Sequence, residues 1–179
     1  MDQGSGAAET LRVPPAPEQP AAAVAALYSE HALSLIRLAH IMLGDRAAAE
    51  DVVQDAFCGL YRRWEYLAGK DHALGYVRSS VLNGCRSVLR LRPASELTAA
   101  HSPVAVSAEA AVLSAEERRE VVRALRRLPG RQRDVLVLRY YLDLPDEMIA
   151  SDLGMRASSV RSARRRALAS LERLLKEQS

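Results

Sequence analysis

Hydrophobic residues recur every three or four positions along most of this chain, which is the periodicity of amphipathic α-helices. The pattern predicts three helices in the first half, over residues 24–43, 46–63 and 73–91. Gly44 is placed to end the first helix, Asp45 to cap the second, and Pro93 to stop the third. No stretch of useful length alternates with the period of a β-strand, so the expected fold class is all-α.

The second half of the chain continues the helical pattern. Ser114 and Glu117 have capping-box spacing and open a helix that runs to Leu128. Pro129 and Gly130 break it, and a further helix is expected from about residue 131 to 142. Two last helices follow, joined by a tight turn: a short one closed by Gly154 and a longer one over 159–176, which a serine is placed to cap.

Proline and glycine positions divide the chain into units. Residues 1–22 hold several prolines and glycines and little to bury, which predicts a disordered tail. Residues 93–112 contain two prolines and few large apolar side chains, which is typical of a flexible linker. We therefore expect two small helical domains, 23–92 and 113–176, joined by that linker.

The last helix is strongly basic, with seven basic residues and one acid between Arg156 and Lys176. A short scaffold helix, a glycine turn and a basic amphipathic helix form the pattern of a helix-turn-helix, whose second helix enters the DNA major groove. The alternative is a solvated basic face on an ordinary bundle helix. The candidate DNA-binding residues are Arg156, Ser158, Ser159, Arg161, Ser162, Arg164 and Arg165.

Two further clusters lie in the first domain. An acidic and amide stripe consists of Glu50, Asp51, Gln54 and Asp55. This stripe either docks against a basic partner or merely lies near the positive N-terminus of its helix. The third helix carries several arginines and no acid, which is an electrostatic footprint for phosphates. Its candidates are Arg78, Asn83, Arg86 and Arg90, of which Asn83 is suited to a base edge or, alternatively, satisfies backbone groups.

Composition narrows the function classes. The chain has 179 residues, 26% of them charged and 49% hydrophobic, with a net charge of +3, an ordinary globular balance. Cys58 and Cys85 lie far apart and the four histidines are scattered, so neither a zinc site, another metal site nor a disulfide framework is expected. No membrane span or signal peptide is evident, which predicts a cytoplasmic protein. We also expect no cofactor.

The order of these features resembles the sigma-70 family of bacterial transcription initiation factors, specifically its small extracytoplasmic-function group. The first segment that carries the resemblance is AEDVVQDAF at 49–57. The second is LPGRQRDVLVLRYY at 128–141, which continues through SSVRS at 158–162 and RAL at 166–168. A weaker match is YVRSSVLN at 76–83. Together these segments cover roughly residues 24 to 176.

The resemblance implies a function for each domain. Residues 23–92 are similar to sigma domain 2, which contacts core RNA polymerase through the acidic stripe and handles the −10 promoter element. Residues 113–176 are similar to sigma domain 4, which reads the −35 element. The implied partners are core RNA polymerase, promoter DNA and, by analogy, an anti-sigma factor.

Two other function classes compete with this interpretation. One is a helix-turn-helix transcriptional regulator that acts without being a polymerase subunit. A response regulator of that kind needs an α/β receiver domain, and the pattern over 24–92 predicts no strands. The other is an enzyme, but no phosphate-cradling glycine loop, nucleophile elbow or metal constellation occurs in the sequence. We therefore expect a non-enzymatic promoter-specificity subunit.

Overall fold

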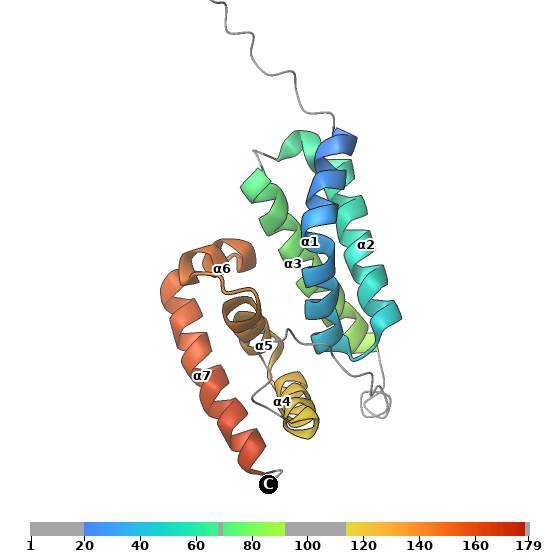
Figure 1. Cartoon of the computed structure of the whole chain (residues 1–179). Helices are drawn as coiled ribbons and strands as arrows, with labels where there is room; N and C mark the ends of the chain where they lie inside the picture. Colours follow the sequence, from blue (N-terminus) through green and yellow to red (C-terminus); the bar gives the residue numbers. More distant parts are fainter. Residues whose placement is uncertain (1–19, 68–69, 92–113, 178–179) are drawn as a thin grey trace, which may run out of the picture.

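A computed structural model describes residues 20–67, 70–91 and 114–177, and all of their regular structure is helical (Figure 1). The helices are α1 (Pro20–Leu43), α2 (Arg46–Arg63), α3 (Lys70–Leu91), α4 (Ala115–Arg127), α5 (Gly130–Leu136), α6 (Asp146–Leu153) and α7 (Ala157–Lys176). A 3₁₀ turn, η1 (Trp64–Tyr66), follows α2, and a π-helical turn, η4 (Val137–Tyr141), follows α5. The expected all-α fold is confirmed. The linker, and the tail up to residue 19, lie outside the described residues.

Helices α1, α2 and α3 pack side by side as the first unit (Figure 1). The buried positions of α2 recur every three or four residues, as expected of an amphipathic helix: Ala49, Val52, Val53, Ala56, Phe57 and Leu60. Each fully buried leucine or phenylalanine contributes about 2 kcal/mol to folding. The Asp45 side chain accepts a hydrogen bond from the backbone N–H of Ala48 at 3.1 Å, which confirms the expected N-cap.

Helices α4 to α7 form the second unit, in which α7 lies along α4, α5 and α6 (Figure 1). The capping box that opens α4 is confirmed, because Ser114 and Glu117 each accept a hydrogen bond from the other's backbone N–H. The buried side of α7 consists of Val160, Ala163, Ala167 and Leu174. The small alanines let α7 lie close to the helices beneath it.

Some helix ends differ from the expected positions. Helix α1 begins at Pro20, within the expected tail, because proline is compatible with a first helical position and the following alanines favour helix. The expected serine cap of α7 is wrong: Arg156 occupies the N-cap without a side-chain hydrogen bond, and both serines lie in the first turn. The expected helix over 131–142 consists of two parts. The first is the α-helix α5, and the second is the wider π-helical turn η4, where the Leu142 N–H donates to the Val137 carbonyl.

The two units also touch one another. Helix α3 packs against α6, and α1 contacts α4. The buried apolar residues of both units form one continuous cluster. Charged side chains from each unit lie in this junction, among them Arg78 of α3 and Asp152 of α6, so the junction shapes the candidate DNA-binding surface of α3.

Candidate DNA-binding and polymerase-binding surfaces

The helix-turn-helix is built from α6, a turn at Gly154 and α7. Gly154 has a φ of 60°, the left-handed conformation that favours glycine at a helix end. The Met155 N–H donates to the Ala150 carbonyl at 2.8 Å, and Arg131 of α5 donates to the Leu153 carbonyl at 2.9 Å. These bonds satisfy carbonyls at the end of α6 and fix the direction in which α7 leaves the turn.

The candidate residues of α7 fall into two groups. Arg156, Ser158, Ser159, Arg161 and Arg165 are exposed. Ser162 and Arg164 are partly buried, and Arg164 donates to the Asp146 carboxylate of α6 at 2.7 Å. Arg164 therefore ties the recognition helix to its scaffold helix. Arg161 and Arg165, four residues apart on one face, form no hydrogen bond or ion pair within the described residues and remain available to an anion.

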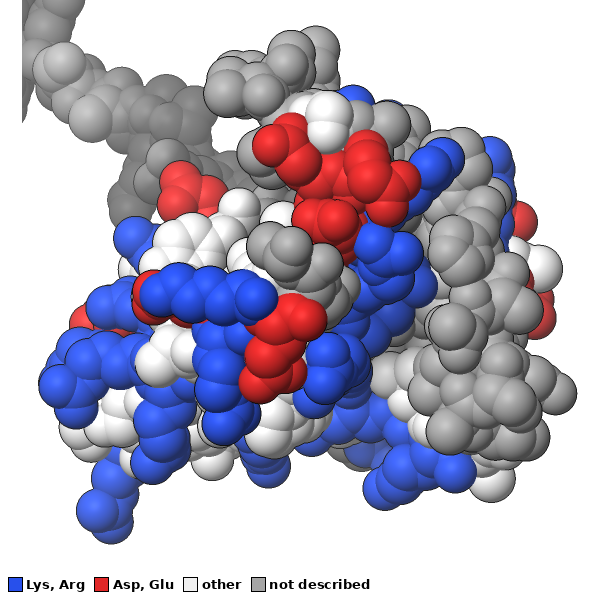
Figure 2. Space-filling model, turned by 90° about the horizontal axis from the view of Figure 1, so that it is seen from below, with Lys and Arg blue, Asp and Glu red and all other residues white. Residues whose placement is uncertain are grey.

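Basic side chains gather over much of the described surface seen from the end of the molecule where α4 and the C-terminus lie (Figure 2). Acidic side chains form smaller groups on the same face. Helix α7 carries Arg173 and Lys176 in its last turn, and α4 carries the exposed Arg127 in its own last turn. A polyanion such as DNA is attracted to a surface of this kind by phosphate neutralisation, independently of sequence.

The four candidates on α3 do not form one open surface. Asn83 and Arg90 are exposed, and Arg90 donates to the Ser87 hydroxyl at 3.0 Å. Arg86 is partly buried and donates to the Asn83 side chain. Arg78 is 6% exposed and forms an ion pair with Asp152 of α6. Of the three candidate arginines on α3, only Arg90 is fully exposed to a DNA strand in this arrangement.

The acidic stripe lies on the outer face of α2. Glu50, Asp51, Gln54 and Asp55 are all exposed, opposite the buried apolar face. Glu50 pairs with Arg46 one turn earlier at 2.7 Å. Asp51 and Asp55 form no hydrogen bond or ion pair within the described part of the chain. Their two carboxylates are therefore ready to meet positive groups of a partner.

These geometries agree with what comparison with known proteins finds. The family description "Sigma-70 region 2" matches residues 27–92, and "Sigma-70, region 4" matches residues 118–171. The RNA polymerase sigma-E factor of Streptomyces coelicolor is 33% identical over 138 residues, which are 77% of each chain. This chain belongs to the sigma-70 family. The extracytoplasmic-function sigma factor SigL of Mycobacterium tuberculosis is 31% identical over 174 residues, covering 93% of this sigma factor and 96% of SigL.

Solved structures share the fold of this sigma factor. The structure of CnrH in complex with the cytosolic domain of CnrY has a TM-score of 0.68 at 23% identity, and covers 89% of this chain and 96% of CnrH. The sigma factor RpoE of Bartonella quintana, solved with the anti-sigma factor NepR, has a TM-score of 0.61 at 21% identity. It covers 84% of this sigma factor and 97% of RpoE.

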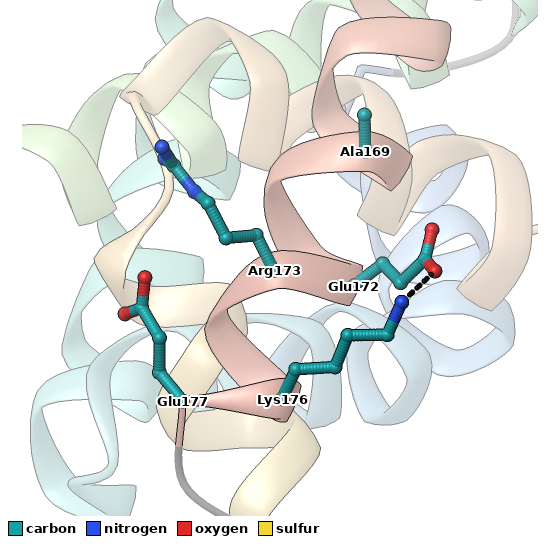
Figure 3. A pocket seen from close by; sticks show the side chains of 5 residues that line it. All are labelled: Ala169, Glu172, Arg173, Lys176 and Glu177. Atoms are coloured by element: carbon teal, nitrogen blue, oxygen red, sulfur yellow. Dashed lines mark hydrogen bonds and ion pairs between the residues drawn. The ribbon is translucent and has the colours of Figure 1, made fainter.

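No small-molecule or metal site of this sigma factor emerges from the described residues. A shallow hollow near the end of α7 is lined by Ala169, Glu172, Arg173, Lys176 and Glu177 (Figure 3). Its Lys176 and Glu172 side chains pair with each other at 2.7 Å, and one stretch of chain supplies the whole lining. Within the described ranges, no three metal-binding side chains cluster, and no helix is long and apolar enough to cross a membrane.

Sequence reasoning missed three residues that shape these surfaces. Asp152 binds Arg78, and Arg126 of α4 donates to the His40 and Ile41 carbonyls at the end of α1. Neither position differs in sequence pattern from its exposed neighbours, so no local signal marks it. Asp134 is fully buried. An acid directly before the apolar run Val-Leu-Val-Leu was a signal that could have found it.

Proposed function

We propose that this chain is a promoter-specificity subunit: it binds bacterial core RNA polymerase and directs −10 and −35 recognition and transcription initiation. The observation that carries the proposal is the exposed pair Arg161 and Arg165 on a helix held in place by Gly154 and the Arg164–Asp146 ion pair. Residues near the start of a recognition helix reach base edges, which favours Ser158, Ser159, Arg161 and Ser162. Arg165 comes a turn later and meets phosphates.

The acidic stripe on α2 supplies the polymerase contact. Asp51 and Asp55 are exposed and form no ion pair among the described residues, so they bind a basic surface without first breaking an internal contact. Asn83, Arg86 and Arg90 serve the −10 element, and Arg78 joins them once its pair with Asp152 is broken. The subunit makes no covalent bond itself and needs no cofactor or metal.

An anti-sigma factor is a third partner in this proposal. RpoE is solved in complex with the anti-sigma factor NepR. The shared family and fold support the extension to this chain. Core polymerase acts in the cytoplasm, which is where this function places the protein.

Reconstitution with purified core polymerase tests the proposal. The chain is expected to co-elute with core and to start transcription at defined sites in a library of promoter fragments. An Arg161→Ala chain should keep the co-elution and relax start-site selection at one base of the −35 element. A chain that binds promoter fragments by itself and never associates with core would instead be a helix-turn-helix regulator that is not a polymerase subunit.

A further inference from the structure

The recognition helix α7 and its scaffold helix α6 meet at an angle, and one ion pair spans it (Figure 1). The Arg164 guanidinium of α7 donates to the Asp146 carboxylate of α6 at 2.7 Å. Asp146 is the first residue of α6, and the turn at Gly154 lies just past the other end of that helix. The pair therefore lies about 10 Å from the turn along each of the two helices. Together the turn and the pair hold α7 at two separated points, which fixes the angle.

Other restraints on this angle are weaker. The first two turns of α7 bury only Val160 and Ala163, and the next buried residue is Ala167. Alanine ends at Cβ, so it allows a close approach but interlocks little with the side chains of a neighbouring helix. The N-cap residue, Arg156, makes no side-chain hydrogen bond that would fix the start of α7. The ion pair, far from the turn, therefore has the greatest leverage on the direction of α7.

Burial distinguishes Arg164 from the arginines that are free to meet DNA. The Arg164 side chain is 27% exposed and that of Asp146 13%, whereas Arg161 and Arg165 are exposed. If Arg164 left this pair for a phosphate, it would give up a charge-assisted hydrogen bond and leave a largely buried carboxylate unpaired. Asp146 thus neutralises one cation of an arginine-rich helix, which lowers the attraction to DNA of any sequence.

We propose that Arg164 and Asp146 are positioning residues that set the −35 base preference of this sigma factor without touching DNA. Their ion pair fixes the angle at which α7 presents Arg161 to base edges, and direct readout depends on that geometry. The pair also withholds Arg164 from phosphates, so that binding depends more on the base contacts. Base selection by the pair rests on the proposed function, whereas the pair itself is measurable in the free chain.

Three substitutions separate this role from a direct phosphate contact. In Asp146→Asn, Arg164 becomes free to bind phosphate, so affinity for every −35 sequence should rise and the slope of affinity against salt should steepen by about one. Discrimination against single-base changes should fall about tenfold, which is the value of one good base contact. Arg164→Ala should lose the same discrimination with an unchanged salt slope. Arg164→Lys should keep the discrimination, because an ammonium also pairs with Asp146.

Holoenzyme reconstituted from the full-length chain and core polymerase is the material for this test. Its affinity is measured across a range of salt for promoter fragments that differ by single base pairs in the −35 element. Glu147→Gln is the matched control, since it removes an exposed acid next to Asp146 and should keep wild-type discrimination. A salt slope lowered by about one in Arg164→Ala would make Arg164 a phosphate contact and overturn the proposal. Unchanged discrimination in Asp146→Asn would overturn it as well.

Urea unfolding of the free chain tests the pair without DNA or polymerase. Once Asp146→Asn has been made, adding Arg164→Ala should shift the unfolding midpoint little further, because the first change has already removed the interaction. Fully additive shifts would show that the pair does not hold α7 and would overturn the proposal. Should Asp146→Asn fail to fold, Arg164→Ala alone still decides between positioning and phosphate binding through its salt slope. Failure of the wild-type chain to form holoenzyme would refute the proposed function and leave the unfolding result standing.

Discussion

The guanidinium of Arg126 lies where any side chain at position 44 would have to be. A Cβ built on Gly44 would come within 2.8 Å of the Arg126 NH1 atom. Gly44 also has a φ of 75°, which disfavours other residues. A glycine that sequence reasoning assigned to ending a helix therefore has a second role, because it admits an arginine from the other unit.

Gly44→Ala should destabilise the fold more than Gly154→Ala does. Both positions have positive φ, which costs an alanine about 1–2 kcal/mol. Gly154 has no atom within 4 Å of its Cβ position, so it reports that strain alone. Urea unfolding of both variants gives the difference, which measures the Arg126 contact. Equal losses of unfolding free energy would show that Arg126 moves aside without cost.

Asp134 should make stability depend on pH. Burial raises the pKa of this carboxyl to about 6, although Arg86, Arg133 and Arg131 act in the opposite direction. The pKa of the folded state therefore lies above the ordinary aspartate value of 3.8. Folding is therefore most favoured by this group below pH 4, and that contribution is lost as pH rises to about 6. At pH 7 the buried charge costs on the order of 3 kcal/mol.

Asp134→Asn removes this charge while keeping the shape of the side chain. Its unfolding free energy should exceed that of wild type at pH 7, and the decline between pH 4 and 6 should flatten. Denaturant titrations across this range measure both effects. Asp143→Asn is the control, because that carboxylate is 95% exposed, and its profile should follow wild type. A difference in unfolding free energy between Asp134→Asn and wild type that stays constant from pH 4 to 6 would contradict the prediction.

The acidic stripe should determine affinity for core polymerase. Replacing Asp51 and Asp55 with arginine reverses two exposed charges and should weaken core binding while leaving the helical circular dichroism intact. Exposed charges act mainly on association rate, so the defect should shrink at high salt. The control is Glu30→Arg with Glu65→Arg, which makes the same charge change on exposed acids outside the stripe. If the stripe variant competes for core as well as this control does, the stripe is only solvated surface.

Arg161 and Arg165 should differ in what they contribute to DNA binding. Arg161→Ala should cost roughly 1–3 kcal/mol at one base step of the −35 element and relax specificity there. Arg165→Ala should weaken all sequences about equally and lower the slope of affinity against salt by about one. A series of −35 probes bound by the reconstituted holoenzyme separates the two effects. A uniform loss for Arg161→Ala would assign that arginine to phosphates as well.

The two cysteines should react at very different rates. Cys58 is exposed, whereas Cys85 is fully buried on α3, and burial beside Asp134 raises the pKa of its thiol to about 12. Because the thiolate is the reactive form, a maleimide should label Cys58 alone in the native chain and both cysteines in urea. Mass spectrometry distinguishes the two sites. Prompt native labelling of Cys85 would mean that α3 is far more accessible than its burial indicates.

Sequence reasoning succeeded where short-range patterns decide the structure. The buried face of α2, the Asp45 cap, the Ser114–Glu117 capping box and the Gly154 turn each depend on residues within one or two turns of helix. It failed where distant contacts decide. The exposed serines suggested a cap that α7 does not use, and Arg78 looked like a surface arginine because its partner lies 74 positions away. The exposure of the α3 candidates was therefore less predictable than that of the α7 candidates.

Asp152 also limits which hybrid proteins can be made by joining half of this chain to the other half of a relative. It lies in the scaffold helix of one domain and is buried against an arginine of the other, so its identity is set jointly by two domains. A hybrid that takes its C-terminal half from a relative without an acid at this position would bury the Arg78 guanidinium without the carboxylate that pairs with it. A substitution at Asp152 or at Arg78 therefore needs a compensating change in the other half, and the boundary between the halves is not a neutral place to recombine.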